Sequence, residues 1–381
     1  MSFTHLAVLI RQQAKKYGKR TALKYRDYSK GRWIPITVDR TANALVHLGI
    51  EEHENIAVFS QNKPEYLYVD FAAFANRAVT IPLFATSSES QVQYMINDAQ
   101  IRYVFVGEQL QYDIAFRVIA LCPSLQQIII FDNTVVKDPR DDHSVYFDEF
   151  LEEGNKTSYV EVVEKRRASA LPEDLANILY TSGTTGESKG VMLHHSNYIA
   201  AVKAHDKRLV DMSDADVVMS FLPLAHVFEK AWVYYSLSVG AQVCVNLNPA
   251  DIQKTLKEVR PTLMSNVPRF WEKVYIGVKE KIDSTTGITK KLMLDALKVG
   301  HKHNNEYVRV GKTPPLGLRL KYKFYEKTVY SLLKKTLGLD RGNFFPTAGA
   351  TVPSEICEFV HSVGINMMVG YGLTESTATV S

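Results

Sequence analysis

Short apolar runs alternate with helical patterns along the 381-residue chain, and this alternation restricts the folds open to it. Strands that alternate with helices form βαβ units, in which neighbouring strands run parallel and helices cover the sheet. The sequence therefore predicts an α/β fold with two lobes of βαβ sheets flanked by helices. The runs and patterns alternate at 55–59, 64–76, 78–82, 89–98 and 102–106, and again at 217–221, 226–239, 241–245 and 250–259.

Composition favours a compact protein and argues against several functional classes. With 46% hydrophobic and 23% charged residues, the chain can bury a substantial core. A net charge of +4 and the lack of a recognisable reader module argue against nucleic acid as a partner. The three cysteines match no metal or disulfide pattern, and no membrane-spanning run or signal-peptide pattern is visible. We therefore expect a cytoplasmic protein.

Residues 180–190 (YTSGTTGESKG) form a segment dense in hydroxyls and glycines, directly after the apolar run 175–179. Glycines let the backbone turn its N–H groups toward an anion, hydroxyls add donors, and Lys189 adds positive charge. The segment is not a Walker A loop, because Ser188 stands where that motif has its second glycine and Gly190 follows the lysine. Ordinary turns use the same residue types, so this segment alone leaves both interpretations open.

A second segment favours the phosphate interpretation. Residues 369–376 (VGYGLTES) follow another apolar run, 365–368, and place an aromatic ring, a hydroxyl and a carboxylate within five residues. An aromatic face can stack on a base, a hydroxyl can bond a phosphate oxygen, and a carboxylate can hold Mg²⁺ beside phosphates. The two segments together indicate a nucleotide and its metal.

The pair also has a counterpart in a known group of enzymes. The pattern TSGTTGxxKG followed by YGxTE resembles the AMP-forming acyl-CoA synthetase superfamily. Three shorter motifs stand between them in the order that the superfamily shows: LPLAHVFE at 222–229, VPR at 267–269 and TAGA at 347–350. PLAHxxE and the stretch VPRFWEK are similar to the long-chain fatty acyl-CoA synthetases in particular.

The resemblance implies a domain organisation. Residues 1–381 should form a large N-terminal AMP-binding (adenylation) domain, with lobes near 1–170 and 171–345 and a final motif segment at 346–381. It also implies a small distorted β-barrel, which the apolar pattern does not show. In the family a small C-terminal domain follows the YGxTE motif, so we expect that domain to be absent from this chain. The Thr37-Val38 junction is shorter than in relatives, which implies a deletion or missing residues.

The resemblance assigns the first segment to the triphosphate. Its hydroxyls, glycines and lysine should wrap the β- and γ-phosphates of ATP, and Thr184 should also act in catalysis. Ser188 stands where relatives often have proline, which removes a rigid turn but no donor. The residues assigned to the phosphates are Thr181, Ser182, Gly183, Thr184, Thr185, Gly186 and Lys189.

The resemblance assigns the second segment to the Mg²⁺ ion and to the adenine of ATP. Glu375 should hold Mg²⁺ and take part in catalysis, and Thr374 should contact an α-phosphate oxygen. Tyr371 should pack on adenine, with Gly372 beside it. These roles are implied by the family's motif, residue by residue.

Several further positions match family motifs less directly. Gly349 and Ala350 should let adenine and the acyl carboxylate approach the backbone closely. His226 corresponds to the catalytic histidine beside the acyl carboxylate and the path of the thiol, although a lone histidine is more often an interior group. Arg269 has three open interpretations: a phosphate contact, an anchor in the acyl-tunnel wall, or a structural role. For Trp232, packing is favoured over a role as tunnel gate.

The implied activity is ATP-dependent activation of a long-chain fatty acid. The acid's carboxylate attacks the α-phosphorus to give acyl-AMP and pyrophosphate, and the thiolate of coenzyme A then attacks the acyl carbon and releases AMP. Two alternatives stay open: a fatty acyl-AMP ligase that loads a carrier protein, and a nucleotide-binding fragment without turnover. The motifs encode neither acyl chain length nor oligomeric state.

Residues 320–335 form a basic helical pattern that includes aromatic and aliphatic side chains. Such a helix can rest on a membrane surface. We favour the alternative, in which Phe324, Val329 and Leu332 form a stripe that is buried in the helix's own domain. A family that consumes fatty acids keeps open a peripheral contact with the inner face of a membrane.

Overall fold

A computed structural model describes residues 3–18, 22–27, 32–35, 39–182 and 187–381, and their contacts group into two compact units. The first unit comprises Met1–Ala215, Phe221–Pro249 and Leu373–Thr379, and the second comprises Asp216–Ser220, Ala250–Gly372 and Val380–Ser381. The lobes expected at 1–170 and 171–345 stay a prediction, because compactness alone does not define a domain. The Thr37-Val38 junction lies outside the described residues.

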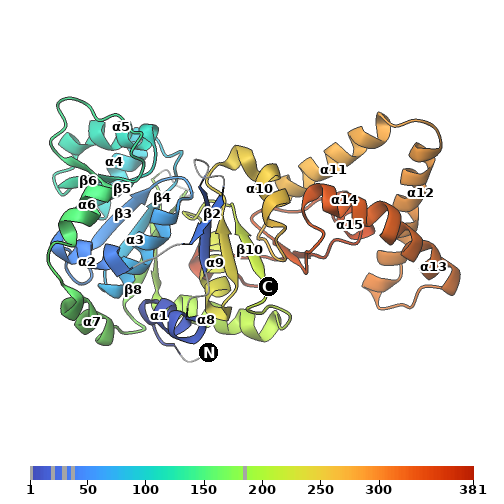
Figure 1. Ribbon diagram of the computed structural model, residues 1–381, viewed down its shortest axis with the longest axis horizontal. Coiled ribbons are helices and arrows are strands. Elements are labelled where there is room, and N and C mark those ends of the chain that lie inside the picture. Colours follow the sequence, from blue (N-terminus) through green and yellow to red (C-terminus); the bar gives the residue numbers. More distant parts are fainter. Residues whose placement is uncertain (1–2, 19–21, 28–31, 36–38, 183–186) are drawn as a thin grey trace. The chain divides into compact units, whose positions relative to one another are not determined.

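A seven-stranded sheet forms the centre of the first unit (Figure 1). The strands lie in the order β7-β6-β5-β3-β4-β8-β9, and all are parallel except β9, which is antiparallel to β8. The parallel βαβ arrangement expected from the alternating pattern is thus confirmed. The strands are β3 (Asn55–Phe59), β4 (Val79–Leu83), β5 (Tyr103–Val106), β6 (Gln127–Ile130), β7 (Ser144–Tyr146), β8 (Leu175–Thr181) and β9 (Lys189–His194).

Helices cover the sheet, because its central strands β3, β4 and β5 are buried along almost their whole length. Parallel strands that are buried on both faces need apolar side chains on both. Ala57, Phe59 and Ile81 belong to one core cluster with residues of α4 and α5, while α2, α3, α6 and α7 contact one another in a separate layer. The helices of this unit are α1 (Leu6–Tyr17), α2 (Asp39–His47), α3 (Pro64–Ala75), α4 (Glu89–Asp98), α5 (Gln109–Val118), α6 (Phe147–Gly154), α7 (Val160–Ala168), α8 (His195–Arg208) and α9 (Val227–Val239).

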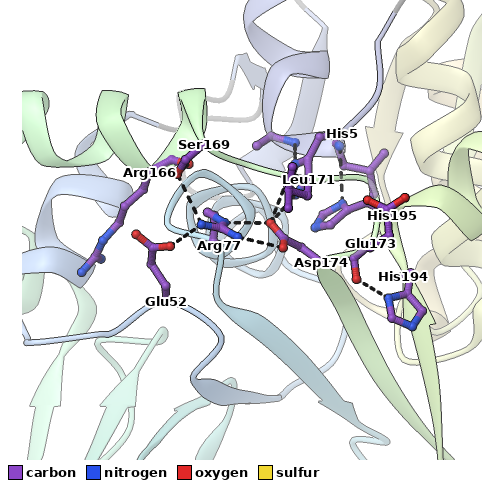
Figure 2. Close-up of polar contacts among 12 residues, drawn as sticks. His5, Glu52, Arg77, Arg166, Ser169, Leu171, Glu173, Asp174, His194 and His195 are labelled. Atoms are coloured by element: carbon purple, nitrogen blue, oxygen red, sulfur yellow. Dashed lines mark hydrogen bonds and ion pairs between the residues drawn. The ribbon is translucent and has the colours of Figure 1, made fainter.

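A polar cluster holds the amino end of β8 (Figure 2). Arg77, in the turn before β4, donates from Nε and a terminal nitrogen to the two oxygens of Asp174, at 2.8 and 3.0 Å. The ring of His5, which caps α1, lies 3.5 Å from that of His195 and 3.7 Å by its Nε2 from an Asp174 oxygen. Burial lowers the pKa of His5 to about 4, so this cluster contains neutral imidazoles at pH 7.

The same unit also contains β1 (Leu23–Asp27), β2 (Arg32–Pro35) and β11 (Gln242–Val245). Strand β1 pairs parallel with β11 and antiparallel with β2. The small β-barrel implied by the family resemblance is not confirmed by the described residues. A short helical turn, η5 (Thr374–Ser376), contacts β9.

The second unit is largely helical around a small parallel sheet. Strand β12 pairs parallel with β13, and Leu263 bridges β10 to Phe344, just before β12. The elements are β10 (Val217–Ser220), α10 (Ile252–Val259), α11 (Pro268–Asp283), α12 (Gly287–Asn304), α13 (Leu316–Tyr325), the π-helical turn η4 (Glu326–Tyr330), α14 (Ser331–Leu337), β12 (Phe345–Thr347), α15 (Ser354–Ser362) and β13 (Met367–Val369). The α/β fold class expected from the sequence is confirmed.

The favoured interpretation of the basic helix is wrong. Phe324 and Leu332 are 54% and 63% exposed, whereas Tyr325 and Tyr330 are buried. Helical periodicity predicts an apolar stripe but not whether another element covers it, and both ends of this stripe face solvent. In the part of the chain that the structure describes, every helix is too short or too polar to cross a bilayer.

Candidate active site

A cleft of about 320 Å³ lies in the first unit, at the carboxyl ends of β4 and β8. It combines apolar side chains with hydroxyls and one imidazole, all from elements that meet at this edge of the sheet. The lining residues are Pro82, Phe84, Ser87, Gln91, Met95, Leu179, Tyr180, Thr181, Ser182, Ser188, Ala225, His226, Val227 and Thr374.

The position of the cleft follows from the sheet topology. Strand β4 leads through α4 to β5, which lies on the far side of β3, whereas β8 leads outward to β9. The connections of two neighbouring strands therefore leave in opposite directions, which opens a crevice at their carboxyl ends. Ligands of open α/β sheets bind in such crevices.

The phosphate-loop candidate joins β8 to β9 as a hairpin beside the cleft. Thr181 pairs with Lys189 across the two strands, so the ends of the loop are held by the sheet. Thr181, Ser182 and Ser188 line the cleft, and Lys189 is exposed at the start of β9. The remaining assigned residues, Gly183, Thr184, Thr185 and Gly186, lie outside the described residues.

Two close contacts determine how this hairpin packs. A β-carbon on Gly190 would lie 2.7 Å from the Cγ2 of Ile178, so only glycine fits there without a shift. Tyr180 donates a hydrogen bond to Asp98 at the end of α4. This bond ties β8 to the helix that supplies Gln91 and Met95 to the opposite wall of the cleft.

His226 stands at the N-cap of α9, where its Nδ1 accepts the backbone N–H of Phe228 at 3.1 Å. That bond leaves the proton of a neutral ring on Nε2. The ring is exposed at the cleft, yet the surrounding protein still desolvates it and lowers its pKa. A helix N-terminus also disfavours a cation. His226 is therefore a neutral donor at pH 7.

Asn62, which sequence reasoning missed, holds the segment that leads to His226. Its Nδ2 donates to the carbonyl of Leu222 at 2.7 Å, and its Oδ1 accepts the N–H of Leu224 at 2.9 Å. Asn62 is 6% exposed and follows the carboxyl end of β3. Its one sequence signal is a polar residue just after a buried strand, which is too common to single it out.

A buried charged network also went unrecognised in the sequence. Asp70 of α3 accepts from Lys230 and Tyr234 of α9 and from Thr80 of β4. Asn177 of β8 donates in turn to the Thr80 hydroxyl. All five side chains are fully buried. The network joins the helix capped by His226 to both strands whose ends form the cleft.

The second motif meets the first in this unit. Thr374 lines the cleft, and its turn η5 contacts β9, the strand that follows the phosphate loop. Glu375 is the next residue and is exposed. Two segments almost 200 residues apart in sequence thus lie side by side, as their shared assignment to ATP requires.

The remaining predicted positions belong to the second unit and meet there at a sheet edge. Thr347 ends β12 and accepts the backbone N–H of Gly370, just past β13, at 2.9 Å. The segments that follow these parallel strands contain Gly349 with Ala350, and Tyr371 with Gly372. Gly349 adopts a φ of +93°, which favours glycine, although a β-carbon would meet only Val267.

Comparison with known proteins assigns the chain to a family. The model of the AMP-binding enzyme family matches residues 10–381.

The chain belongs to the AMP-binding enzyme family.

Several curated members are long-chain acyl-CoA ligases. The human long-chain-fatty-acid–CoA ligase ACSBG2 is 31% identical over 352 residues, which cover 89% of this chain and 50% of the human protein. The peroxisomal long chain acyl-CoA synthetase 7 of Arabidopsis thaliana is 28% identical over 348 residues, covering 89% of this chain and 47% of that protein. The chain thus spans about half the length of these relatives.

Solved structures show the same fold. An anthranilate CoA ligase in complex with anthranoyl-AMP superposes with a TM-score of 0.70 at 15% identity, covering 98% of this chain and 61% of the other. A putative long-chain-fatty-acid CoA ligase from Rhodopseudomonas palustris gives 0.68 at 15% identity, covering 99% and 77%. At such identities the likeness concerns the fold of this AMP-binding enzyme alone.

The donor set of this family member suits a metal that is held mainly by phosphates. Among the described residues, no three His, Cys, Asp or Glu side chains gather to bind a metal by themselves. Glu375 is exposed beside the cleft-lining Thr374, and no described residue pairs with its carboxylate. Mg²⁺ is commonly bound by one or two carboxylates together with substrate phosphates and water. Glu375 therefore fits the role.

Two residues had open interpretations in the sequence. Trp232 is 3% exposed within α9, which agrees with packing rather than with a gate. Arg269 is exposed in the first turn of α11, in the second unit, and its role stays a prediction.

Proposed function

We propose that the protein containing this chain converts a long-chain fatty acid, ATP and coenzyme A into acyl-CoA, AMP and pyrophosphate. One observation carries the proposal: the two ends of the phosphate loop, the capping His226 and Thr374 of the second motif line one cleft. The cleft lies where an α/β sheet binds ligands, and its hydroxyls and imidazole are donors suited to anions.

The residues of the chain act by positioning and by neutralising charge. Thr181, Ser182 and Lys189 hold the β- and γ-phosphates, so that pyrophosphate can leave as the acid's carboxylate bonds to the α-phosphorus. Thr374 donates to an α-phosphate oxygen. Glu375 would hold Mg²⁺, which supplies further neutralisation of the phosphates. Tyr371 and Gly349 belong to the second unit, and their assignment to adenine rests on the family resemblance alone.

His226 acts on the acyl group. As a neutral ring with its proton on Nε2, it can donate to the carboxylate without forming an ion pair that would reduce its nucleophilicity. In the second step the thiolate of coenzyme A attacks the acyl carbon, the bond to the phosphate oxygen breaks, and AMP leaves. The apolar residues Phe84 and Met95 on the wall help to exclude water from the acyl-AMP.

The choice of long-chain acids rests on the relatives, whose names specify a long acyl chain or a long-chain fatty acid. We place the activity in the cytoplasm and include peripheral contact with a membrane, since long acyl chains partition into bilayers.

The proposal is tested with the full-length protein, ATP, Mg²⁺, coenzyme A and palmitate. We expect palmitoyl-CoA, AMP and pyrophosphate in equal amounts. Lys189→Met should lower kcat/KM about 100-fold, because it removes a charge from the developing pyrophosphate. Lys203→Met, at an exposed position on α8, is the matched control and should leave kcat/KM unchanged. Absence of any acyl product with ATP and Mg²⁺ contradicts the proposal.

Two alternatives share the first half-reaction. Fatty acyl-AMP that reacts with a carrier protein but not with coenzyme A would identify a carrier-loading ligase. For the 381-residue chain alone, we expect ATP binding with poor adenylation, because the chain spans about half the length of the long-chain acyl-CoA ligases that it resembles. Fatty-acid-dependent release of pyrophosphate from this chain at the full-length rate would refute that expectation.

A further inference from the structure

Helix α13 has an exposed apolar row. Leu316, Leu320 and Phe324 are 68%, 62% and 54% exposed. A spacing of four residues places all three on one face of the helix. Large apolar side chains that are exposed together, rather than singly, mark an interaction surface.

A second row on the same helix is cationic. Arg319 and Lys323 follow Leu316 and Leu320 by three residues each, so they form a row beside the apolar one. Lys327, in the π-helical turn, is exposed as well. No carboxylate pairs with any of these three cations among the described residues, whereas Lys321 is neutralised by Asp295 at 2.9 Å.

The opposite face of α13 is fixed to the second unit. Tyr325 is buried and donates to Asp295 of α12, and Tyr330 donates to the Ala296 carbonyl at 2.6 Å. The ring of Tyr322 stacks on His303 with centroids 3.9 Å apart. These aromatic contacts hold α13 beside α12 (Figure 1). The exposed row is therefore presented by a well-anchored helix.

We propose that this face of α13 docks on an anionic lipid bilayer, with Leu316, Leu320 and Phe324 at the acyl boundary and Arg319, Lys323 and Lys327 on the headgroups. The charge complementarity selects this occupant. Of the six Lys and Arg residues from Leu316 to Leu337, Lys321 and Lys334 pair with Asp295 and Glu326. The other four form no ion pair with a carboxylate among the described residues and attract an anionic surface. A nucleic acid would not bury the apolar side chains of α13, whereas the acyl region of a bilayer removes them from water and so stabilises the docked state.

The docking also suits the proposed function, but its test is independent of it. The full-length protein is incubated without substrates, either with phosphatidylcholine vesicles or with phosphatidylcholine vesicles that contain about 30% phosphatidylserine. Bound protein is measured by flotation. We expect binding to the anionic vesicles that weakens as salt rises. Arg319→Ser/Lys323→Ser/Lys327→Ser should weaken the partition on the order of 100-fold, because each cation contributes about fivefold.

The apolar row is tested separately. Leu320→Ser/Phe324→Ser should weaken binding at least about tenfold, since both side chains leave the bilayer. A matched control, Val136→Ser/Val210→Ser with Lys203→Ser/Lys207→Ser, removes exposed apolar and cationic side chains elsewhere and should bind as wild type does. Circular dichroism confirms that each variant is folded.

Three outcomes overturn the proposal: equal binding to neutral and anionic vesicles, binding that survives in both α13 variants, or self-association in sedimentation that the α13 variants abolish without any vesicle binding. The last would identify a second copy as the occupant. Ligase activity, assayed with palmitate on albumin, separates a failure of docking from a failure of the proposed enzyme function.

Discussion

The Nζ of Lys230 lies 2.5 Å from the Oδ2 of Asp70, and neither side chain is exposed to solvent. Burial lowers the pKa of Lys230, while the Asp70 charge and hydrogen bond oppose that shift. The carboxylate also accepts from Thr80 at 2.8 Å and from Tyr234 at 3.0 Å. Because each charge is fully paired, the network can hold α9, and with it the cap residue His226, against the sheet.

Breaking this pair should be more costly than removing it. Lys230→Met leaves the Asp70 charge buried without its cation, so we expect the free energy of unfolding to fall by about 3–5 kcal/mol in urea titrations. Asp70→Asn/Lys230→Met should lose less than Lys230→Met alone. The control Lys203→Met, at an exposed site, should cost under about 0.5 kcal/mol. This account would be contradicted if the double variant lost as much unfolding free energy as Asp70→Asn and Lys230→Met lose in sum.

Asn62 should act as a positioning residue. Asn62→Ala leaves the Leu222 carbonyl and the Leu224 N–H without their partner, which should cost about 1–3 kcal/mol of stability. Because these groups lead to His226, kcat/KM of the proposed ligase should fall about tenfold or more. Asn55→Ala is the control, since Asn55 donates to the Ala99 carbonyl at the other end of β3. Similar kinetic losses in both variants would leave Asn62 with a purely structural role.

The chemistry of His226 can be separated from its capping of α9. Asn is as good an N-cap, so His226→Asn should change stability by less than about 0.5 kcal/mol, while its kcat/KM falls about 100-fold. Desolvation lowers the pKa of His226 below its ordinary value of 6.5, so the ring is still mostly neutral at pH 6.5. The acid limb of the wild-type pH–rate profile should therefore lie below pH 6.5. An acid limb above that pH would show that the active ring is not desolvated.

His5 should make the fold sensitive to acid. Its folded-state pKa is about 4, against 6.5 when exposed, so the unfolded chain binds a proton first as pH falls. Stability is thus complete above pH 6.5 and declines toward pH 4, by up to about 3 kcal/mol for this group. His361, whose pKa is also lowered to about 4 by burial, adds to the decline.

The contribution of His5 can be isolated by substitution. His5→Asn retains an acceptor for the Ala7 N–H but cannot be protonated, so its unfolding free energy should vary less between pH 6.5 and 4. His143→Asn, at a half-exposed ring, is the control. Parallel pH dependence in wild type and His5→Asn would rule out the assignment.

Position 190 should accept a side chain only if the neighbouring side chain of Ile178 is made smaller. Gly190→Ala places a β-carbon 2.7 Å from Ile178 Cγ2 and should cost about 1–3 kcal/mol in thermal or chemical unfolding. Adding Ile178→Ala removes the clashing atom, so the double variant should regain part of the stability that Gly190→Ala loses. Gly277→Ala, in an open position on α11, should be neutral or stabilising by up to about 1 kcal/mol.

Much of the architecture could be predicted from local pattern. The apolar runs at 55–59 and 102–106 became parallel strands, because a run that is apolar on both faces is stable only inside a sheet covered on both sides. The two motif segments were recognised because their residue types suit phosphate and metal. Neither inference needs a long-range contact.

Other features depend on such contacts and could not be predicted. Asn62 and Asp70 look like ordinary polar residues until the fold places backbone groups and Lys230 beside them, up to 162 residues away in sequence. The burial of Phe324 was predicted wrongly, because helical periodicity shows that a stripe exists but not whether another element covers it.

By itself, the sequence determined the fold class, the family and the types of groups that we propose to bind ATP, since these follow from periodicity and from the chemistry of short motifs. Only the tertiary structure decided that Thr374 lies beside the phosphate loop, that a buried ion pair supports the helix of His226, and that α13 presents its apolar row to solvent. The reason is that burial and pairing are properties of neighbours brought together by folding, and a linear pattern does not specify which neighbours those are.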